Sequence, residues 1–197
     1  GDGSFLSMDE CSYYLNLLKK SEKRAVRLLG GEPFLHPQIG DFISIVLSDP
    51  WFRHLTIFTS GFIREEHFHL LGDQKINLVI NLNHPDDYTP QNYKLLVKNL
   101  KKLADTPVQL TIGFNIYREK FDYKPALSLA KRLGCRSFRW AIAVPSADCE
   151  TEHLTRDRRN RLGARIIKFM ESCVREHIEP VLDFPIEPFI FNEEQIR

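Results

Sequence analysis

The stretch that decides the fold runs from Arg27 to Pro37 and reads Arg-Leu-Leu-Gly-Gly-Glu-Pro-Phe-Leu-His-Pro. It begins in an apolar, strand-like run and stops at Gly30 and Gly31. Paired glycines after a buried strand let backbone amides and carbonyls approach a ligand closely, because no Cβ stands in the way. Glu32 and Pro33 follow at once and add a corner that is rigid and rich in acceptors. Such a corner suits a ligand cation such as an α-ammonium group.

Around this stretch, short apolar runs alternate with longer amphipathic segments. We expect strands over residues 25–29, 55–59, 76–81, 108–115, 138–144 and 181–184. We expect helices over residues 7–20, 125–133 and 158–177, and one that starts near Thr89-Pro90. On the helix that starts near Thr89-Pro90, the expected apolar stripe is Leu95, Leu96, Leu100 and Leu103. On the helix over residues 158–177, it is Ile166, Ile167, Met170 and Val174. Repeated strand–helix–strand units with short connections predict parallel strands.

A parallel sheet of this kind is either doubly wound or a barrel, and both place reacting groups beyond the carboxyl ends of the strands. Five of the expected strand ends are polar or carry glycine: 30–32, 59–61, 81–84, 115 and 145–146. Turns alone favour Gly, Asn and Pro, which explains any single end. Five such ends in succession indicate a rim that faces a ligand.

The composition is that of an ordinary globular domain. The 197 residues are 43% hydrophobic, and no linker or low-complexity tract divides them, so we expect one domain over 1–197. Lys and Arg number 27 against 26 Asp and Glu, a balance that argues against a dedicated nucleic-acid binder. No apolar run is long enough to span a bilayer and no secretory signal is visible, so we expect a cytoplasmic protein without membrane contact.

The spacing of the four cysteines predicts that they are free thiols. Cys11, Cys135, Cys149 and Cys173 are far apart in the sequence and form no CxxC, which excludes zinc-ribbon and thioredoxin sites. A domain of this size needs no disulfide framework.

Gly30-Gly31-Glu32-Pro33 resembles the GGEP motif of the radical S-adenosylmethionine (radical SAM) enzymes. In that family the motif ends the second strand and holds the methionyl ammonium of the cofactor. The next strand commonly ends in Thr-Asn-Gly, and Thr59-Ser60-Gly61 differs from it at one position. The resemblance extends over roughly residues 7–191. It implies a partial (β/α)6-type, TIM-like barrel and cofactor contacts from Gly30, Gly31, Glu32, Pro33, Ser60, Asn81, Asn115 and Arg139.

One departure from the family concerns the iron–sulfur cluster. The family binds a 4Fe-4S cluster through a CxxxCxxC loop after its first strand, whereas Cys11 is the only cysteine before Gly30. We therefore expect a truncated piece of a longer protein, an interpretation that the non-Met residue Gly1 favours, or else a degenerate relative. The parent would use S-adenosylmethionine and the cluster, and this chain is expected to bind neither and to be inactive. Without its first strand the sheet should be open, and its apolar edge at residues 25–29 should favour dimerisation.

The leading hypothesis is thus the core of a radical SAM enzyme that abstracts hydrogen from an unknown substrate, with no catalytic residue assigned. The alternative is a degenerate, non-catalytic barrel that binds a ligand or a protein. A third is a hydrolase with a rim zinc held by His36, His84 and either Asp86 or Asp183, although His36 is more simply a brace for the loop after Pro33. Residues 183–197 resemble the start of a C-terminal extension that carries auxiliary clusters, with Phe189 at an expected cysteine position.

Overall fold

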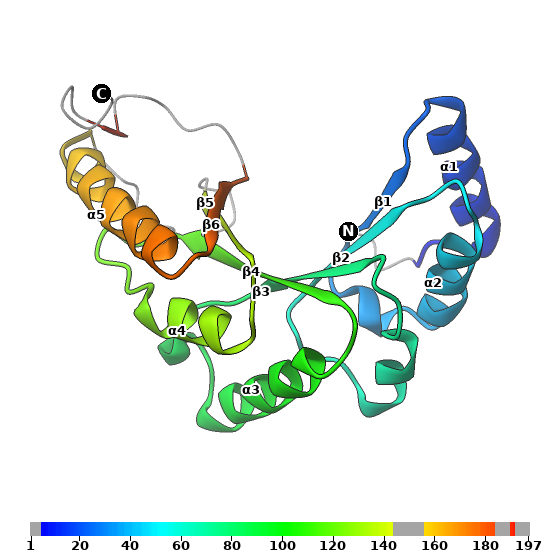
Figure 1. Ribbon diagram of the computed structural model, residues 1–197, viewed down its shortest axis with the longest axis horizontal. Coiled ribbons are helices and arrows are strands. Elements are labelled where there is room, and N and C mark those ends of the chain that lie inside the picture. The colour runs from blue at the N-terminus through cyan, green and yellow to red at the C-terminus, as the bar shows by residue number, and fades with distance from the viewer. Residues whose placement is uncertain (1–4, 144–155, 184–189, 192–197) are drawn as a thin grey trace. The chain divides into compact units, whose positions relative to one another are not determined.

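The computed structural model describes residues 5–143, 156–183 and 190–191 (Figure 1). Its helices are α1 (Met8–Lys20), α2 (Ile39–Ser48), α3 (Pro90–Ala104), α4 (Lys124–Arg132) and α5 (Arg156–Arg175). Its strands are β1 (Ala25–Leu28), β2 (His54–Thr59), β3 (Ile76–Asn81), β4 (Gln109–Ile116), β5 (Ser137–Ile142) and β6 (Glu179–Leu182). The described residues also include the short 3-10 helices η1 (Pro33–Leu35), η2 (Glu65–Leu70) and η3 (Pro85–Asp87).

The strands follow one another through the sheet in chain order, from β1 to β6. The pairs β1–β2, β2–β3, β4–β5 and β5–β6 are all parallel. The predicted parallel α/β fold is therefore confirmed, and the linear order, with β1 and β6 at its ends, confirms an open sheet. Dimerisation through the edge of β1 stays a prediction. The strand expected to reach residue 144 ends at Ile142, and residue 144 lies outside the described residues.

The chain divides into two compact units, which we describe separately. Unit 1 comprises residues 1–80 and 92–110, and unit 2 comprises residues 81–91 and 111–197. In unit 1, α1 and α2 lie on the same side of β1 and β2 (Figure 1). The alternation of buried and exposed residues along β2 places Leu55 and Ile57, both with 0% exposure, in the core. That alternation is expected for a strand with one face against helices.

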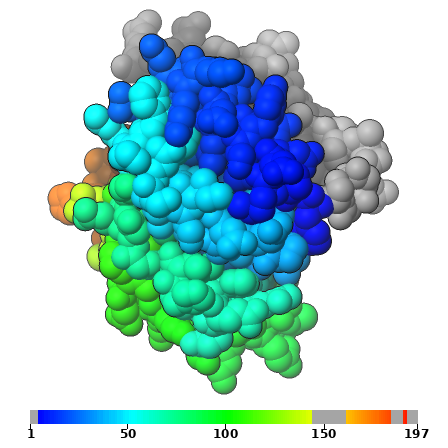
Figure 2. Space-filling view, turned by 90° about the vertical axis from the view of Figure 1, so that its right-hand side faces the viewer, coloured from blue at the N-terminus to red at the C-terminus, as the bar shows by residue number. Residues whose placement is uncertain are grey.

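Helix α1 begins as the sequence predicts. The Ser7 hydroxyl accepts a hydrogen bond from the Glu10 backbone N–H (3.2 Å), and the Glu10 carboxylate accepts one from the Ser7 N–H (2.8 Å). This reciprocal pair is a capping box, which satisfies two N–H groups that the first turn leaves free. The helix lies at the surface of unit 1, where it is dark blue in Figure 2, and exposes Tyr13 and Leu17.

In unit 2, an aromatic cluster joins the sheet to α5. The Phe169 ring lies 5.2 Å from the Phe138 ring and 6.1 Å from the Trp140 ring, measured between centroids. Phe138 and Trp140 alternate along β5 with the half-buried Arg139, which puts the aromatic rings on the helix side of the strand. The fold is thus fixed by large buried side chains at alternate positions.

The predicted apolar stripes of two helices need correction. Val174 on α5 is 62% exposed, and the buried face is instead Leu162, Ile166, Phe169 and Cys173. On α3, Leu95 is 47% exposed, whereas Leu96, Leu100 and Leu103 are fully buried. Neighbouring residues on a helix point about 100° apart. Where two adjacent rows are both apolar, the sequence pattern alone does not choose the row that packs.

Candidate functional site

The loop after β1 leaves open space beside its two glycines. Gly30 and Gly31 follow Leu28 and Leu29, where the chain leaves the sheet, and both are exposed. A Cβ added at either position would have no heavy atom within 4 Å. Packing within the protein therefore does not require glycine here. The bare backbone is instead free to be approached by a ligand.

Glu32 ties this loop to the end of β2. Its carboxylate accepts hydrogen bonds from the backbone N–H of Phe34 (3.2 Å) and from the hydroxyl of Thr59 (2.7 Å). It also accepts two from Ser60, through the backbone N–H (2.8 Å) and the hydroxyl (2.5 Å). Charge-assisted hydrogen bonds of this kind are stronger than neutral ones. Three of them span 27 or 28 residues of sequence and fix the position of the corner.

The loop after β2 has a glycine for a different reason. Gly61 has a backbone φ of +82°, a conformation that residues with a side chain rarely adopt. A Cβ at this position would lie 2.6 Å from Leu96 Cδ1 and 3.1 Å from Ile80 Cγ2. The buried Asn99 amide donates to the carbonyl oxygens of Gly61 and Ile63, both at 3.1 Å. Side chains in the core of unit 1 therefore fix the conformation of this loop.

Five of the predicted site residues thus lie in unit 1 and belong to one loop pair. Glu32 and Ser60 are in direct contact. Pro33 is buried at the first position of η1, and Glu32 directly before it is the N-cap of that turn. Gly30 and Gly31 form the exposed part of the corner. The Glu32 carboxylate was predicted to meet the ligand cation, but the structure shows its oxygens occupied by four protein donors.

The other three predicted residues lie in unit 2. Asn81 is the last residue of β3, and Asn115 is an exposed residue near the end of β4. Arg139 lies within β5, where Nε donates to Asp183 Oδ1 (2.8 Å) and Nη2 to Asp183 Oδ2. The two-point pairing that made Arg139 attractive for a ligand carboxylate is made here with a protein carboxylate. Its contact with a cofactor stays a prediction.

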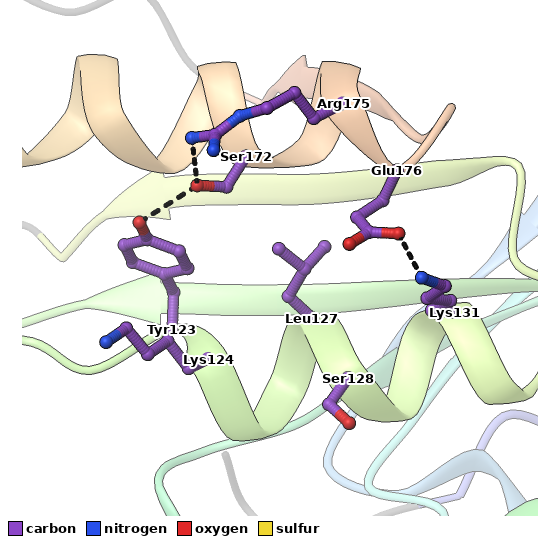
Figure 3. A pocket seen from close by; sticks show the side chains of 8 residues that line it. All are labelled: Tyr123, Lys124, Leu127, Ser128, Lys131, Ser172, Arg175 and Glu176. Carbon is purple, nitrogen blue, oxygen red and sulfur yellow. Dashed lines mark hydrogen bonds and ion pairs between the residues drawn. The ribbon is translucent and has the colours of Figure 1, made fainter.

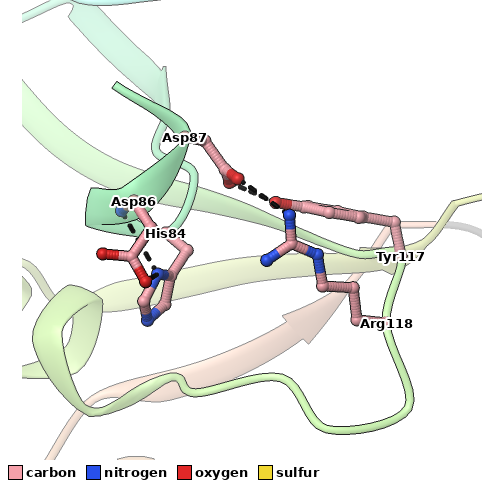
Figure 4. A network of polar contacts seen from close by, with 5 residues as sticks. All are labelled: His84, Asp86, Asp87, Tyr117 and Arg118. Atoms are coloured by element: carbon pink, nitrogen blue, oxygen red, sulfur yellow. Dashed lines mark hydrogen bonds and ion pairs between the residues drawn. The ribbon is translucent and has the colours of Figure 1, made fainter. Parts of the chain in front are cut away.

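Sequence reasoning missed a polar network at the carboxyl ends of β3 and β4. The Asp87 carboxylate accepts hydrogen bonds from the Tyr117 hydroxyl and from Arg118 Nη2 (3.1 Å), as Figure 4 shows. Burial, reinforced by Asp87, raises the pKa of Tyr117 to about 12. The signal was present in the sequence, because both segments directly follow strand ends on the predicted rim.

A hollow with a volume of about 380 Å³ lies between α4 and α5 in unit 2 (Figure 3). Tyr123 Oη meets Ser172 Oγ at 3.1 Å on one side, and an ion pair joins Lys131 and Glu176 on the other. None of the predicted site residues lines it. These contacts join the two helices.

His36 does not fit the zinc site that was considered for the rim. Both ring nitrogens of His36 are engaged, Nε2 with the Leu6 carbonyl (2.9 Å) and Nδ1 with the Gln38 N–H (3.0 Å). His36 therefore braces the loop after Pro33, as predicted, and has no nitrogen left for zinc. Among the described residues, no group of three His, Cys, Asp or Glu side chains could hold a metal ion.

The cysteines do not fit a 4Fe-4S cluster either. Of the described residues, Cys11, Cys135 and Cys173 are buried free thiols. Burial raises the pKa of Cys135 to about 11 and that of Cys173 to about 12, so both stay protonated near neutral pH. A cluster ligand must be a thiolate. The fourth, Cys149, lies outside the described residues, and no CxxxCxxC occurs in the sequence.

A known protein family matches the part of the chain that contains the loop pair. The model of the radical SAM superfamily matches residues 1–121. The chain belongs to this superfamily. The match includes β1, β2, β3 and β4, and with them the glycine corner and its partner loop. The resemblance seen in the GGEP motif is therefore confirmed for this radical SAM chain.

Two curated relatives of this radical SAM chain act on nucleotides, by their names. The S-adenosylmethionine-dependent nucleotide dehydratase RSAD2 of Siniperca chuatsi is 30% identical over 121 residues, which cover 56% of this chain and 34% of the relative. The GTP 3',8-cyclase of Chlorobaculum tepidum is 28% identical over 117 residues, 56% of this chain and 35% of that one. The matched part thus spans about a third of each relative.

Solved structures share the fold. Streptococcus suis SuiB bound to S-adenosylmethionine has a TM-score of 0.66 and 16% identity, over 87% of this chain and 40% of SuiB. SuiB bound to its precursor peptide SuiA has a TM-score of 0.68 at the same identity, over 87% and 41%. At this identity the likeness establishes the α/β arrangement alone. No helix in the described part of the chain is both long and apolar enough to cross a membrane.

Proposed function

We propose that this chain carries the S-adenosylmethionine-binding corner of a radical SAM enzyme, with the backbone of Gly30 and Gly31 as the contact for the methionyl end. The observation that carries the proposal is the open space in front of both glycines. Superfamily membership supplies the cofactor class. When bound and reduced through an iron–sulfur cluster, S-adenosylmethionine supplies the 5'-deoxyadenosyl radical that abstracts hydrogen from a substrate.

In this proposal Glu32 is a positioning residue. Because its oxygens are held by Phe34, Thr59 and Ser60, it orients the loop that carries the glycines. The backbone carbonyls next to it are the acceptors for an α-ammonium group. A loop fixed before the ligand arrives loses little freedom on binding, which favours affinity.

The cluster and the radical chemistry belong to the parent enzyme in this proposal. No CxxxCxxC of this sequence offers ligands for the cluster, so cleavage of the cofactor is not proposed for the chain by itself. Binding of S-adenosylmethionine is proposed for it, in place of the expectation from the sequence that the chain binds neither group. Asn81 and Arg139 stay predicted cofactor contacts that rest on the family resemblance alone. The alternative of a degenerate binding module predicts no affinity for S-adenosylmethionine.

The test is a binding titration that compares glycines in different surroundings. Calorimetry with S-adenosylmethionine should give saturable binding to the chain, and Gly31→Ala should weaken it about tenfold, since a methyl group would enter the ligand's space. Gly40→Ala is the matched control, because a Cβ there meets only Leu70 at ordinary contact distances of 3.5 and 3.7 Å. Absence of binding, or equal loss in both variants, would contradict the proposal.

A further inference from the structure

We propose that a hollow beyond strands β3 and β4 binds an oxyanion of the substrate, either a phosphate or a carboxylate group. The hollow has a volume of about 190 Å³, and all its lining residues belong to unit 2. Two segments line it: His84 and Asp86 after β3, and residues 114–122 at and after the end of β4. The inference rests on the proposed function only in taking the ligand to be the substrate of a radical SAM enzyme.

The hollow contains hydrogen-bond donors without partners. Within the described residues, neither the Lys120 ammonium nor the Asn115 amide makes a hydrogen bond or an ion pair. At His84, Asp86 engages Nδ1 through its backbone N–H (3.3 Å) and its carboxylate (3.2 Å), and Nε2 makes no hydrogen bond within the described residues. The proposal gives Asn115 to the substrate, in place of its predicted contact with the cofactor.

The carboxylates near the hollow are already engaged. Asp122 Oδ1 accepts a hydrogen bond from the Lys124 backbone N–H (3.0 Å). Asp86 Oδ2 lies 3.2 Å from His84 Nδ1, and its side chain is 82% exposed. Asp87 accepts from Tyr117 and Arg118. Within the described residues, Lys120 is therefore the charged side chain of the lining that makes neither a hydrogen bond nor an ion pair, and an anion complements it.

The walls of the hollow are held in place before any ligand binds. The Asp87 contacts join the segment after β3 to the segment after β4, and the Arg118 guanidinium lies over the Tyr117 ring at 4.9 Å (Figure 4). The Phe114 and Phe121 rings, which also line the hollow, lie 6.0 Å apart. A site ordered in this way avoids the entropy cost of fixing its own side chains on binding.

The size of the hollow limits what enters it. Pockets that enclose a whole drug-sized ligand usually measure about 300–1,000 Å³. A volume of about 190 Å³ instead suits one oxyanion with a short piece of the molecule attached to it. The group is thus an anchor for the substrate, and the reacting part of the substrate lies outside the hollow.

Two sources of the oxyanion are distinguished by experiment. Nuclear magnetic resonance titrations of the chain with inorganic phosphate, with GTP and with the acidic tripeptide Gly-Glu-Gly should shift the amide resonances of residues 115–122. Tighter binding of GTP than of the tripeptide identifies a nucleotide phosphate, and the reverse order identifies a peptide carboxylate.

Variants decide whether the hollow is the site. Lys120→Ala should weaken phosphate binding at least about tenfold, the effect of losing a charged hydrogen bond, and Asn115→Ala should weaken it less. Both side chains are exposed, so both variants should fold. Lys124→Ala is the matched control, because this exposed lysine lies outside the hollow and should keep the affinity of the unmodified chain.

Three results would overturn the proposal: unshifted resonances at 115–122, equal losses in Lys120→Ala and Lys124→Ala, or displacement of phosphate by S-adenosylmethionine. The first two exclude a defined anion site, and the third assigns the hollow to the cofactor. Each is separable from failure of the proposed function, because that function is tested by S-adenosylmethionine binding to the Gly31→Ala variant.

Discussion

The ends of strands β1 and β2 both carry glycine, yet the two ends use it in opposite ways. Gly30 and Gly31 face open space, and no neighbour within 4 Å would meet a side chain there. Gly61 has a positive φ and stands against Leu96 and Ile80. Glu32 joins the two ends through Thr59 and Ser60. The comparison teaches that the fold requires glycine at the end of β2 and does not require it at the end of β1, where we propose that a ligand does.

Gly61→Ala should give the largest loss of stability. The left-handed backbone costs about 1–2 kcal/mol for a residue with a Cβ, and overpacking against Leu96 adds about 1–3 kcal/mol. Urea unfolding measures the change. A loss below 0.5 kcal/mol, within the ordinary range of a surface substitution, would show that the loop after β2 adapts and would remove the contrast between the two ends.

Glu32→Ala should be the next largest change. It leaves donors from Phe34, Thr59 and Ser60 without their acceptor, at a cost of about 1–3 kcal/mol. Because the loop then moves, affinity for S-adenosylmethionine should fall as well. Glu32→Gln is the control: it keeps the shape and an acceptor oxygen, so calorimetry and urea unfolding should both give intermediate values. Full affinity in Glu32→Ala would contradict its positioning role.

Ser60→Ala should have a smaller effect. The variant loses the hydroxyl that donates to Glu32 at 2.5 Å but keeps the backbone N–H that donates at 2.8 Å. One hydrogen bond to a charged group is worth about 1.5 kcal/mol at its lower end, so urea unfolding should show a loss near that figure. An effect as large as that of Glu32→Ala would mean that the hydroxyl alone holds the loop.

Gly31→Ala should change stability least. With open space at this position, alanine should alter the free energy of unfolding by no more than about 0.5 kcal/mol, or raise it slightly by restricting the unfolded chain. Thermal unfolding of this variant beside Gly61→Ala gives the sharpest contrast. Similar losses in both would show that both glycines are required by the fold.

Much of the fold was predictable from the sequence because each strand is a local pattern. The apolar run at 76–81 matches β3 exactly in its bounds, and the capping box at Ser7 marked the start of α1. The choice between Leu95 and Leu96 was not predictable, because it depends on which row of a helix meets the sheet. That information lies in tertiary packing.

The loop pair of the candidate site was predictable from the sequence, and its contacts were not. The glycine corner could be found from four adjacent residues. The partners of Glu32 lie 27 and 28 residues further along the chain, so no local pattern gives them. The same holds for Arg139, whose carboxylate partner is Asp183, 44 residues away. Contacts between distant residues follow from the sheet order, which only the structure supplies.

The most direct test of the central claim is a nuclear magnetic resonance titration of the chain with S-adenosylmethionine, read at the backbone amides. The account predicts that the resonances of Gly30 and Gly31 shift and saturate with the cofactor, while that of Gly134, at the end of α4 in unit 2, stays in place. Unchanged resonances at Gly30 and Gly31 at saturating cofactor would contradict the claim that this corner receives the ligand.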